Sequence, residues 1–197
     1  MLKHCASISI LLIVLLLVSG PASAQQQNPK ITKNNFKVTM LSLGSGSSRF
    51  TYERAFSPKI SAELTVGVIG WGWDWINHSD PSGVIIKFAP KYNLIPQASA
   101  SSWLAGFYLK PEFLYADFDY NATVGAVISR NHTNQYALLA EFGYQLVLWN
   151  WFDFDIYCGV GPTWGSYNLN NYYHGFMIFP SDGHVGFTAG YRVGIAF

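Results

Sequence analysis

The chain has 197 residues and a formal net charge of +1, and charged residues make up only 12% of it. That share is about half of what a soluble domain usually carries. Aromatic residues make up 17%, and no basic field indicates nucleic acid as a partner. Beyond residue 24 no apolar run approaches 18 residues, which excludes a transmembrane helix from that part of the sequence.

The first 24 residues have the pattern of a secretory signal peptide. A short basic start precedes an apolar run over residues 8–18, which is shorter than the roughly 20 residues that span a bilayer. The small residues Ala22-Ser23-Ala24 are typical of a cleavage site. The sequence therefore predicts an exported chain, with a periplasmic segment over residues 25–35 and a single domain over residues 36–197.

Beyond residue 36, apolar and polar residues alternate with the period of two that is typical of β-strands. The clearest case is the final VGFTAGYRVGIAF, where apolar or aromatic residues from Val185 to Phe197 occupy every second position. The same alternation predicts eight strands, over residues 39–44, 49–56, 60–71, 83–94, 106–116, 135–149, 152–165 and 185–197.

The predicted connections alternate in length. The shorter set is 57–59, 95–103 and 150–151, and the longer set is 72–82, 119–134 and 166–184. Short periplasmic turns, long external loops and an even number of strands of about 9–11 residues are typical of small outer-membrane barrels. We therefore predict an all-β fold, an eight-stranded antiparallel up-and-down transmembrane β-barrel in the cell outer membrane, with both termini periplasmic.

A soluble eight-stranded barrel such as a lipocalin is the alternative fold, and the two predict opposite polarity. A ring of eight strands cannot enclose the face that is uniformly bulky and apolar, but it can enclose glycines and a few salt bridges. The charged face is therefore predicted to line the lumen as a packed network rather than an ion or proton path. Four members are expected at mid-barrel, namely Lys87, Lys110, Glu112 and Glu141. The others are expected nearer the periplasm, namely Glu53, Glu63, Lys91, Asp153, Asp155 and Arg192.

Tryptophans fall near the ends of the predicted strands, where an aromatic girdle meets lipid headgroups. The predicted girdle consists of Trp71, Trp73, Trp103, Trp149, Trp151 and Trp164.

Three prolines, Pro90, Pro111 and Pro162, lie inside predicted strands. A closed barrel has no edge at which a missing N–H is harmless. We expect a bulge or a local kink at these prolines, or strand boundaries that differ by a few residues.

The final strand resembles the C-terminal assembly signal of outer-membrane barrels, with Tyr191, Val193, Ile195 and Phe197 as its alternating residues. The whole mature chain resembles the small OmpA-like and OmpX-like barrels. More narrowly, YERAFSPKISAEL (52–64) and IKFAPKYNL (86–94) are similar to an uncharacterised family of small Gram-negative outer-membrane barrels. Where that family has a PEYR-like segment, this chain has PKYN. The resemblance implies outer-membrane lipids and the outer-membrane assembly machinery as partners, and it implies no catalytic residue.

Other candidate chemistry falls in the predicted outer loops. His78, His132, His174 and His184 lack metal-site spacing, so neither a metal nor another cofactor is predicted. Residues 77–80 (NHSD) bring His, Ser and Asp together, but sequence neighbours rarely form a triad. The sequons at Asn77, Asn121 and Asn131 are interpreted as Asn-rich turns. Residues 167–180 hold three tyrosines and an apolar end, and form either a recognition loop or an extension of the last hairpin.

These observations predict a non-enzymatic outer-membrane barrel with a structural or partner-binding role. It would act through its outer loops or as a subunit of a complex with other outer-membrane proteins. Two alternatives stay open, a lipid A-modifying enzyme and a small pore.

Overall fold

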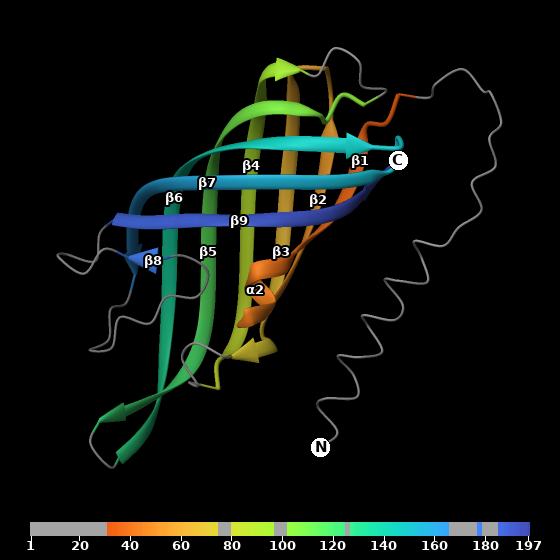
Figure 1. Cartoon of the computed structure of the whole chain (residues 1–197). Coiled ribbons are helices and arrows are strands. Elements are labelled where there is room, and N and C mark those ends of the chain that lie inside the picture. Colours follow the sequence, from red (N-terminus) through yellow and green to blue (C-terminus); the bar gives the residue numbers. More distant parts are fainter. Residues whose placement is uncertain (1–30, 75–79, 97–101, 125–126, 166–176, 179–184) are drawn as a thin grey trace. The chain divides into compact units, whose positions relative to one another are not determined.

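A computed structural model describes residues 31–74, 80–96, 102–124, 127–165, 177–178 and 185–197. The predicted signal peptide therefore lies outside the described residues. Nearly all the described residues belong to strands (Figure 1). The elements are β1 (Asn34–Thr39), α2 (Met40–Gly44), β2 (Ser45–Ala55), β3 (Ile60–Asp74), β4 (Ser82–Pro96), β5 (Gly106–Val124), β6 (Val127–Leu148), β7 (Phe152–Gly165), β8 (Met177–Ile178) and β9 (Val185–Ala196).

The strands form one closed antiparallel sheet. From β1 to β7 each strand pairs with the next, β7 pairs with β9, and β9 returns to β1. The two-residue β8 adds to β9 outside this ring. The predicted all-β, eight-stranded, antiparallel up-and-down barrel is therefore confirmed. The residues of the predicted recognition loop that the structure describes, Met177 and Ile178, pair with β9 and do not extend the β7–β9 hairpin.

The two ends of the barrel differ in their connections. We call the end with the connections 56–59, 97–105 and 149–151 the turn end; the start of β1 and the end of β9 also lie there. The opposite end, where α2 and the connections 75–81, 125–126 and 166–184 lie, is the loop end. At the turn end, Trp149 and Asn150 both have positive φ (50° and 65°), as a two-residue hairpin turn requires.

The first strand differs from its prediction. Residues 39–44 were expected to be extended, but β1 runs from Asn34 to Thr39 and Met40–Gly44 is a short helix. Met40, Leu41 and Leu43 are apolar at positions that break the period of two, which explains why the extended conformation ends at Thr39.

The β5–β6 connection is also shorter than predicted. Residues 119–134 were expected to form a long loop, but β5 and β6 stay paired as far as Val124 and Val127. The β5–β6 hairpin extends beyond β4, because the pairing between β4 and β5 ends at Asp119 (Figure 1). Asn121, Asn131 and His132 therefore lie in strands.

The prolines interrupt hydrogen-bonded ladders without shifting them. Pro90 lies directly opposite Pro111, since the β4–β5 register is the same at Phe88–Phe113 and at Tyr92–Leu109, and the three pairs between are missing from the ladder. The pair of Pro162 is missing from the β6–β7 ladder in the same way. No register shift occurs at any of the three, so the expected bulge is absent from these described strands. A depression of about 380 Å³ lies on the outer face between Pro111 and Pro162, and Ala140 also lines it.

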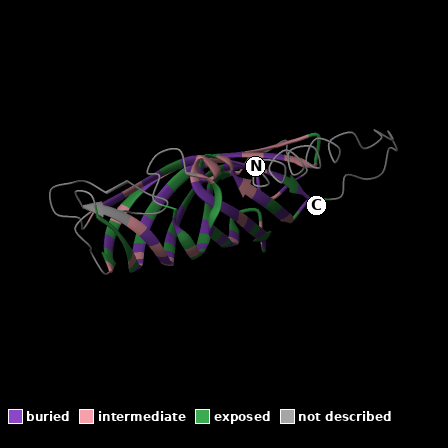
Figure 2. Cartoon of the chain, turned by 90° about the horizontal axis from the view of Figure 1, so that it is seen from below, coloured by how far each residue is buried: buried purple, intermediate pink, exposed green. Residues whose placement is uncertain are grey.

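The two faces of the sheet have opposite polarity. Burial alternates residue by residue along the strands, as the stripes of Figure 2 show. Inward positions are buried and carry the charged residues, whereas outward positions carry bulky apolar residues that remain exposed, such as Phe142 at 60% and Phe88 at 51%. This polarity is the reverse of that expected for a soluble barrel.

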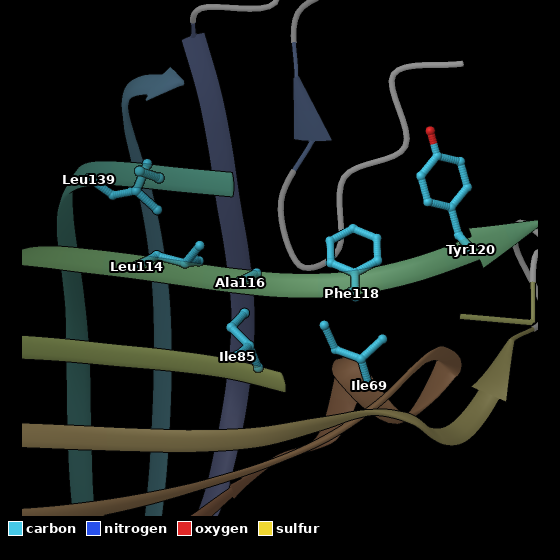
Figure 3. Close-up of a cluster of buried hydrophobic side chains, with 8 residues drawn as sticks. Ile69, Ile85, Leu114, Ala116, Phe118, Tyr120 and Leu139 are labelled. Atoms are coloured by element: carbon cyan, nitrogen blue, oxygen red, sulfur yellow. The ribbon is translucent and has the colours of Figure 1, made fainter. Parts of the chain in front are cut away.

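The inward face also holds a cluster of apolar side chains that the sequence interpretation missed. It lies on β3, β4, β5 and β6 (Figure 3), and it extends toward the loop end from Leu114, the register partner of Lys87. Its members are Ile69, Ile85, Leu114, Ala116, Phe118, Tyr120, Ala137 and Leu139. A second inward cluster at the turn end contains Ala55, Leu104 and Ala196. The charged part of the lumen is thus enclosed between two apolar clusters.

Closure of the barrel can be tested at its β1–β9 seam. Val38 and Val193 are register partners and both lie on the outer face. In a Cys158→Ala background, Val38→Cys with Val193→Cys should form a disulfide under mild oxidation, because paired strands place Cα atoms about 4.5–5.5 Å apart. Val38→Cys with Val160→Cys is the matched control, since β9 separates these strands. Equal cross-linking of both pairs, or of neither, in gel-shift assays would contradict closure.

Candidate functional site: the charge network of the lumen

The candidate site is a network of charged side chains that point into the barrel. All ten residues predicted to line the lumen are buried there, and none is more than 4% exposed. They come from seven strands. The list is Glu53 on β2, Glu63 on β3, Lys87 and Lys91 on β4, Lys110 and Glu112 on β5, Glu141 on β6, Asp153 and Asp155 on β7, and Arg192 on β9.

Strand register explains how these residues meet. Inward side chains on adjacent strands lie directly opposite one another, which pairs Lys110 with Glu141 and Asp155 with Arg192. The same register places Glu53 opposite Glu63. Two like charges directly opposite are destabilising, so this pair requires a shared cation.

Lys37 supplies that cation, and the sequence interpretation missed it. Its Nζ lies 2.8 Å from Glu53, 2.7 Å from Glu63 and 3.0 Å from Asp155. The residue was overlooked because the first strand was expected to begin at residue 39. The alternation of Phe36, Lys37 and Val38 carries the signal, since the two neighbours face outward.

Glu63 is the most highly connected carboxylate of the network. It accepts hydrogen bonds from Lys37, from Lys110 and from Arg192, whose Nη1 is 2.7 Å away. Glu63 thereby connects β3 with β1, β5 and β9. Since Lys110 also lies 3.1 Å from Glu141, the mid-barrel group and the group nearer the turn end form one network.

The remaining cations pair at the sides of the network. Lys91 donates to Glu53 at 2.7 Å and to Gln145, and Lys87 donates to Glu112 at 2.6 Å. Gln145 in turn donates to Asp153 at 2.7 Å. Every carboxylate of the network therefore lies within interaction distance of a cation or an amide.

Two tyrosines complete the lumen. Tyr108 donates its hydroxyl to Asp155 at 2.6 Å, and the Lys91 ammonium lies 4.2 Å from the centre of the Tyr108 ring. The guanidinium of Arg192 lies 4.1 Å from the centre of the Tyr157 ring. Both are cation–π distances, which strengthen with desolvation.

The lumen is electrically balanced. Its six carboxylates are matched by six cations once Lys37 and the buried Arg49 are added to the four predicted basic residues, Lys87, Lys91, Lys110 and Arg192. Arg49 donates to Ser47 at 3.2 Å, on the loop-end side of the network. A neutral, mutually bonded group of this kind fills space and fixes register. Five of its six carboxylates lie next to cations, and the sixth, Asp153, accepts a hydrogen bond from the Gln145 amide.

The other predicted candidates are only partly described. His132 Nδ1 lies 2.9 Å from Asp119 on the exposed face of the β5–β6 hairpin. His78, His174 and His184, the Asn77-His78-Ser79 part of the NHSD motif and most of loop 167–180 lie outside the described residues. Within the described part of the chain, no group of three or more His, Cys, Asp or Glu side chains is arranged to hold a metal ion.

The predicted girdle tryptophans lie at both ends of the barrel. Trp103, Trp149 and Trp151 lie at the turn end, and Trp71, Trp73 and Trp164 lie near the loop-end termini of β3 and β7. Trp149 and Trp151 stack with ring centroids 6.3 Å apart, and Trp164 stacks on Tyr136 at 6.4 Å.

The predicted assembly-signal residues, Tyr191, Val193, Ile195 and Phe197, all occupy outward positions of β9 and its end. The backbones of Phe197 and Asn34 exchange hydrogen bonds of 2.8 and 2.9 Å, which extends the β1–β9 seam by one residue pair.

The comparisons with known proteins add no relative. The chain matches no family model, no curated protein and no solved structure. The resemblance to small outer-membrane barrels therefore remains a prediction. In the described ranges no helix has both the length and the apolar character needed to cross a membrane.

Arg192 offers a test of the network. Arg192→Glu should destabilise the fold more than Arg192→Met, because reversal adds a carboxylate beside Glu63, Asp155 and Glu141, whereas Met keeps much of the volume. Breaking such a buried pair typically costs about 3–5 kcal/mol. Urea unfolding of the folded protein in detergent would measure the difference. Wild-type stability of Arg192→Glu would indicate a hydrated lumen in which water screens the charges.

Proposed function

We propose that this chain is a non-enzymatic β-barrel protein of the cell outer membrane, with both termini on the periplasmic side and a structural or partner-binding role. The observation that carries the proposal is the polarity of the sheet. Charged side chains are buried in the lumen, and large apolar side chains are exposed around the outside. An exposed apolar surface of that extent is unusual on a soluble monomer but is what the lipid-facing wall of a barrel requires.

The position of the aromatic residues supports the same placement. On the outer face near the loop end, Tyr115, Tyr136 and Trp164 form a continuous contact, with ring centroids 5.1 and 6.4 Å apart. At the turn end Trp149, Trp151 and Phe152 contact one another. Aromatic contacts at two heights, with other apolar side chains such as Phe142 and Leu138 between them, match the two interfaces of a bilayer.

The lumen supports a structural role rather than conduction. An eight-stranded barrel is just wide enough for side chains to fill it. Here a balanced charge network occupies the middle, and the Ile69–Leu139 cluster and the Leu104 cluster occupy the two sides. With the interior occupied, the surfaces left for partners are the outer wall and the loop end. Outer-membrane lipids, the assembly machinery that would read β9 and other outer-membrane proteins are the proposed partners.

The proposal predicts that the purified, folded protein adds no stepwise conductance to a planar bilayer, because the charge network and the two apolar clusters occupy the described part of the lumen. It also predicts that lipid A from a deletion strain has an unchanged mass spectrum, since no modifying activity is lost. The wild type is compared in the conductance assay with Glu63→Ala, which removes the carboxylate that has the most cationic partners in the network. Reproducible conductance of the wild type would favour the pore, and a changed lipid A mass would favour the lipid A-modifying enzyme.

Placing a charge on the outer wall should be costly. Phe142 lies on β6, between the two aromatic bands, and its side chain is 60% exposed. Phe142→Arg would therefore place a cation in hydrocarbon. The expected destabilisation is about 2–4 kcal/mol at the bilayer midplane. Phe142→Leu is the matched control and should change little. Equal stability of the arginine and leucine variants in urea unfolding from lipid vesicles would refute the membrane placement of this wall.

A further inference from the structure

The charged residues outside the lumen are segregated by sign between the two ends of the barrel. Among the described side chains those at the turn end are all cations, whereas those at the loop end are three acids and one base. The turn-end residues are Lys33, Arg54 and Lys59. The loop-end residues are Asp80, Asp117, Asp119 and Arg130.

The three turn-end cations, which we call the basic collar, come from adjacent segments. The backbone of Lys33 accepts a hydrogen bond from Ala55 at 2.7 Å, Asn34 is the register partner of Arg54, and Lys59 lies in the turn that follows β2. All three collar side chains are exposed. Within the described residues none of them forms an ion pair with a carboxylate, because every acid on the turn-end half of the barrel points into the lumen.

The collar lies at the edge of the apolar wall. Arg54 occupies an outward position of β2 between Tyr52 and Phe56, and Phe56 is 61% exposed. The Lys33 ammonium lies 4.1 Å from the centre of the Trp103 ring. Long basic side chains whose stems lie along aromatic residues place their charged heads at the polar boundary of a bilayer.

We propose that the basic collar binds the phosphate headgroups of anionic phospholipids in the leaflet that faces the turn end. This inference rests on the proposed membrane placement. Three exposed cations at the turn end complement a layer of phosphate groups, and each Lys or Arg near an anionic membrane surface strengthens binding by about 1 kcal/mol, or roughly fivefold. The acids at the loop end would repel the same headgroups. The collar thus gives the two ends of the barrel different lipid preferences.

The experiment uses the full chain folded into phosphatidylcholine vesicles, with and without phosphatidylglycerol. A bimane fluorophore is attached to Ile60→Cys in a Cys158→Ala background, because Ile60 is 52% exposed and directly follows Lys59. Quenching by acyl-brominated phosphatidylglycerol is compared with quenching by brominated phosphatidylcholine. The wild-type collar should show a preference for the anionic lipid, and raising the salt concentration should weaken that preference.

The variants separate the collar from general charge effects. Arg54→Gln and Lys59→Gln should each lower the preference roughly fivefold, and the double variant should lower it further. Arg130→Gln, which removes one exposed cation at the loop end, is the matched control and should leave the quenching at residue 60 unchanged. Equal quenching by both lipids in the wild type, or a preference that survives the double variant, would overturn the proposal.

Two further measurements distinguish a failure of the membrane placement from a failure of the collar proposal. Bimane at Phe142→Cys should be quenched by brominated phosphatidylcholine if the barrel spans the bilayer. Absence of quenching there would overturn the membrane placement and the collar proposal with it, whereas quenching at residue 142 without an anionic preference at residue 60 overturns the collar alone. If millimolar inorganic phosphate at constant ionic strength abolishes the preference for phosphatidylglycerol at residue 60, the collar binds free phosphate. That result would contradict the proposal that it binds lipid headgroups.

Discussion

The fold depends on the requirement that charges enclosed in the lumen neutralise one another. A buried ion left without its partner costs several kcal/mol, so the strands must place each cation next to a carboxylate. Glu63 shows how this requirement connects strands around the barrel, since the three cations that donate hydrogen bonds to it come from β1, β5 and β9. A slip of one residue in any of these strands would turn its charge to the outer face and bring a bulky apolar side chain inside. The network and the apolar wall therefore specify the same register.

Space in the lumen is as restrictive as charge. Each of several large inward side chains has a glycine as its register partner on the next strand, as in Lys37–Gly194, Tyr108–Gly143 and Tyr157–Gly190. A Cβ atom at Gly143 would lie 2.5 Å from the Tyr108 hydroxyl, and one at Gly194 would lie 2.8 Å from Cγ of Lys37. The glycines on the charged face thus provide the volume that the aromatic rings and lysine stems occupy. This pairing explains how an eight-stranded ring holds twelve charged side chains and two tyrosines.

Much of this arrangement could be predicted from the sequence, because alternation with a period of two determines which face each residue occupies. All ten charges assigned to the lumen from that alternation lie there. Height along the barrel is less well encoded. Leu114 shares a face with Lys110 and Glu112 and lies opposite Lys87, but only the folded structure shows that it packs in an apolar cluster. Lys37 was missed for a different reason. The first strand was predicted over residues 39–44, most of which form the short helix Met40–Gly44, whereas the strand itself lies before them.

The prolines show a limit of local reasoning. A single proline inside a strand predicts a defect, but the sequence does not show that Pro90 and Pro111 face each other. Three residue pairs are lost around these two prolines and the register on both sides is unchanged, as it is around the single Pro162. The pairs on both sides of each interruption therefore maintain the register.

The balance inside the lumen also determines where the molecule can recognise others by charge. Six carboxylates and six cations cancel one another in the interior, and the outer wall between the aromatic bands carries apolar side chains. Electrostatic recognition is thereby left to the two rims, where Lys33, Arg54 and Lys59 oppose the acids of the loop end. The three turn-end cations are exposed, whereas Asp117 and Asp119 at the loop end are partly buried. A closed barrel with a neutral interior thus separates the charges that hold the fold together from those available for binding.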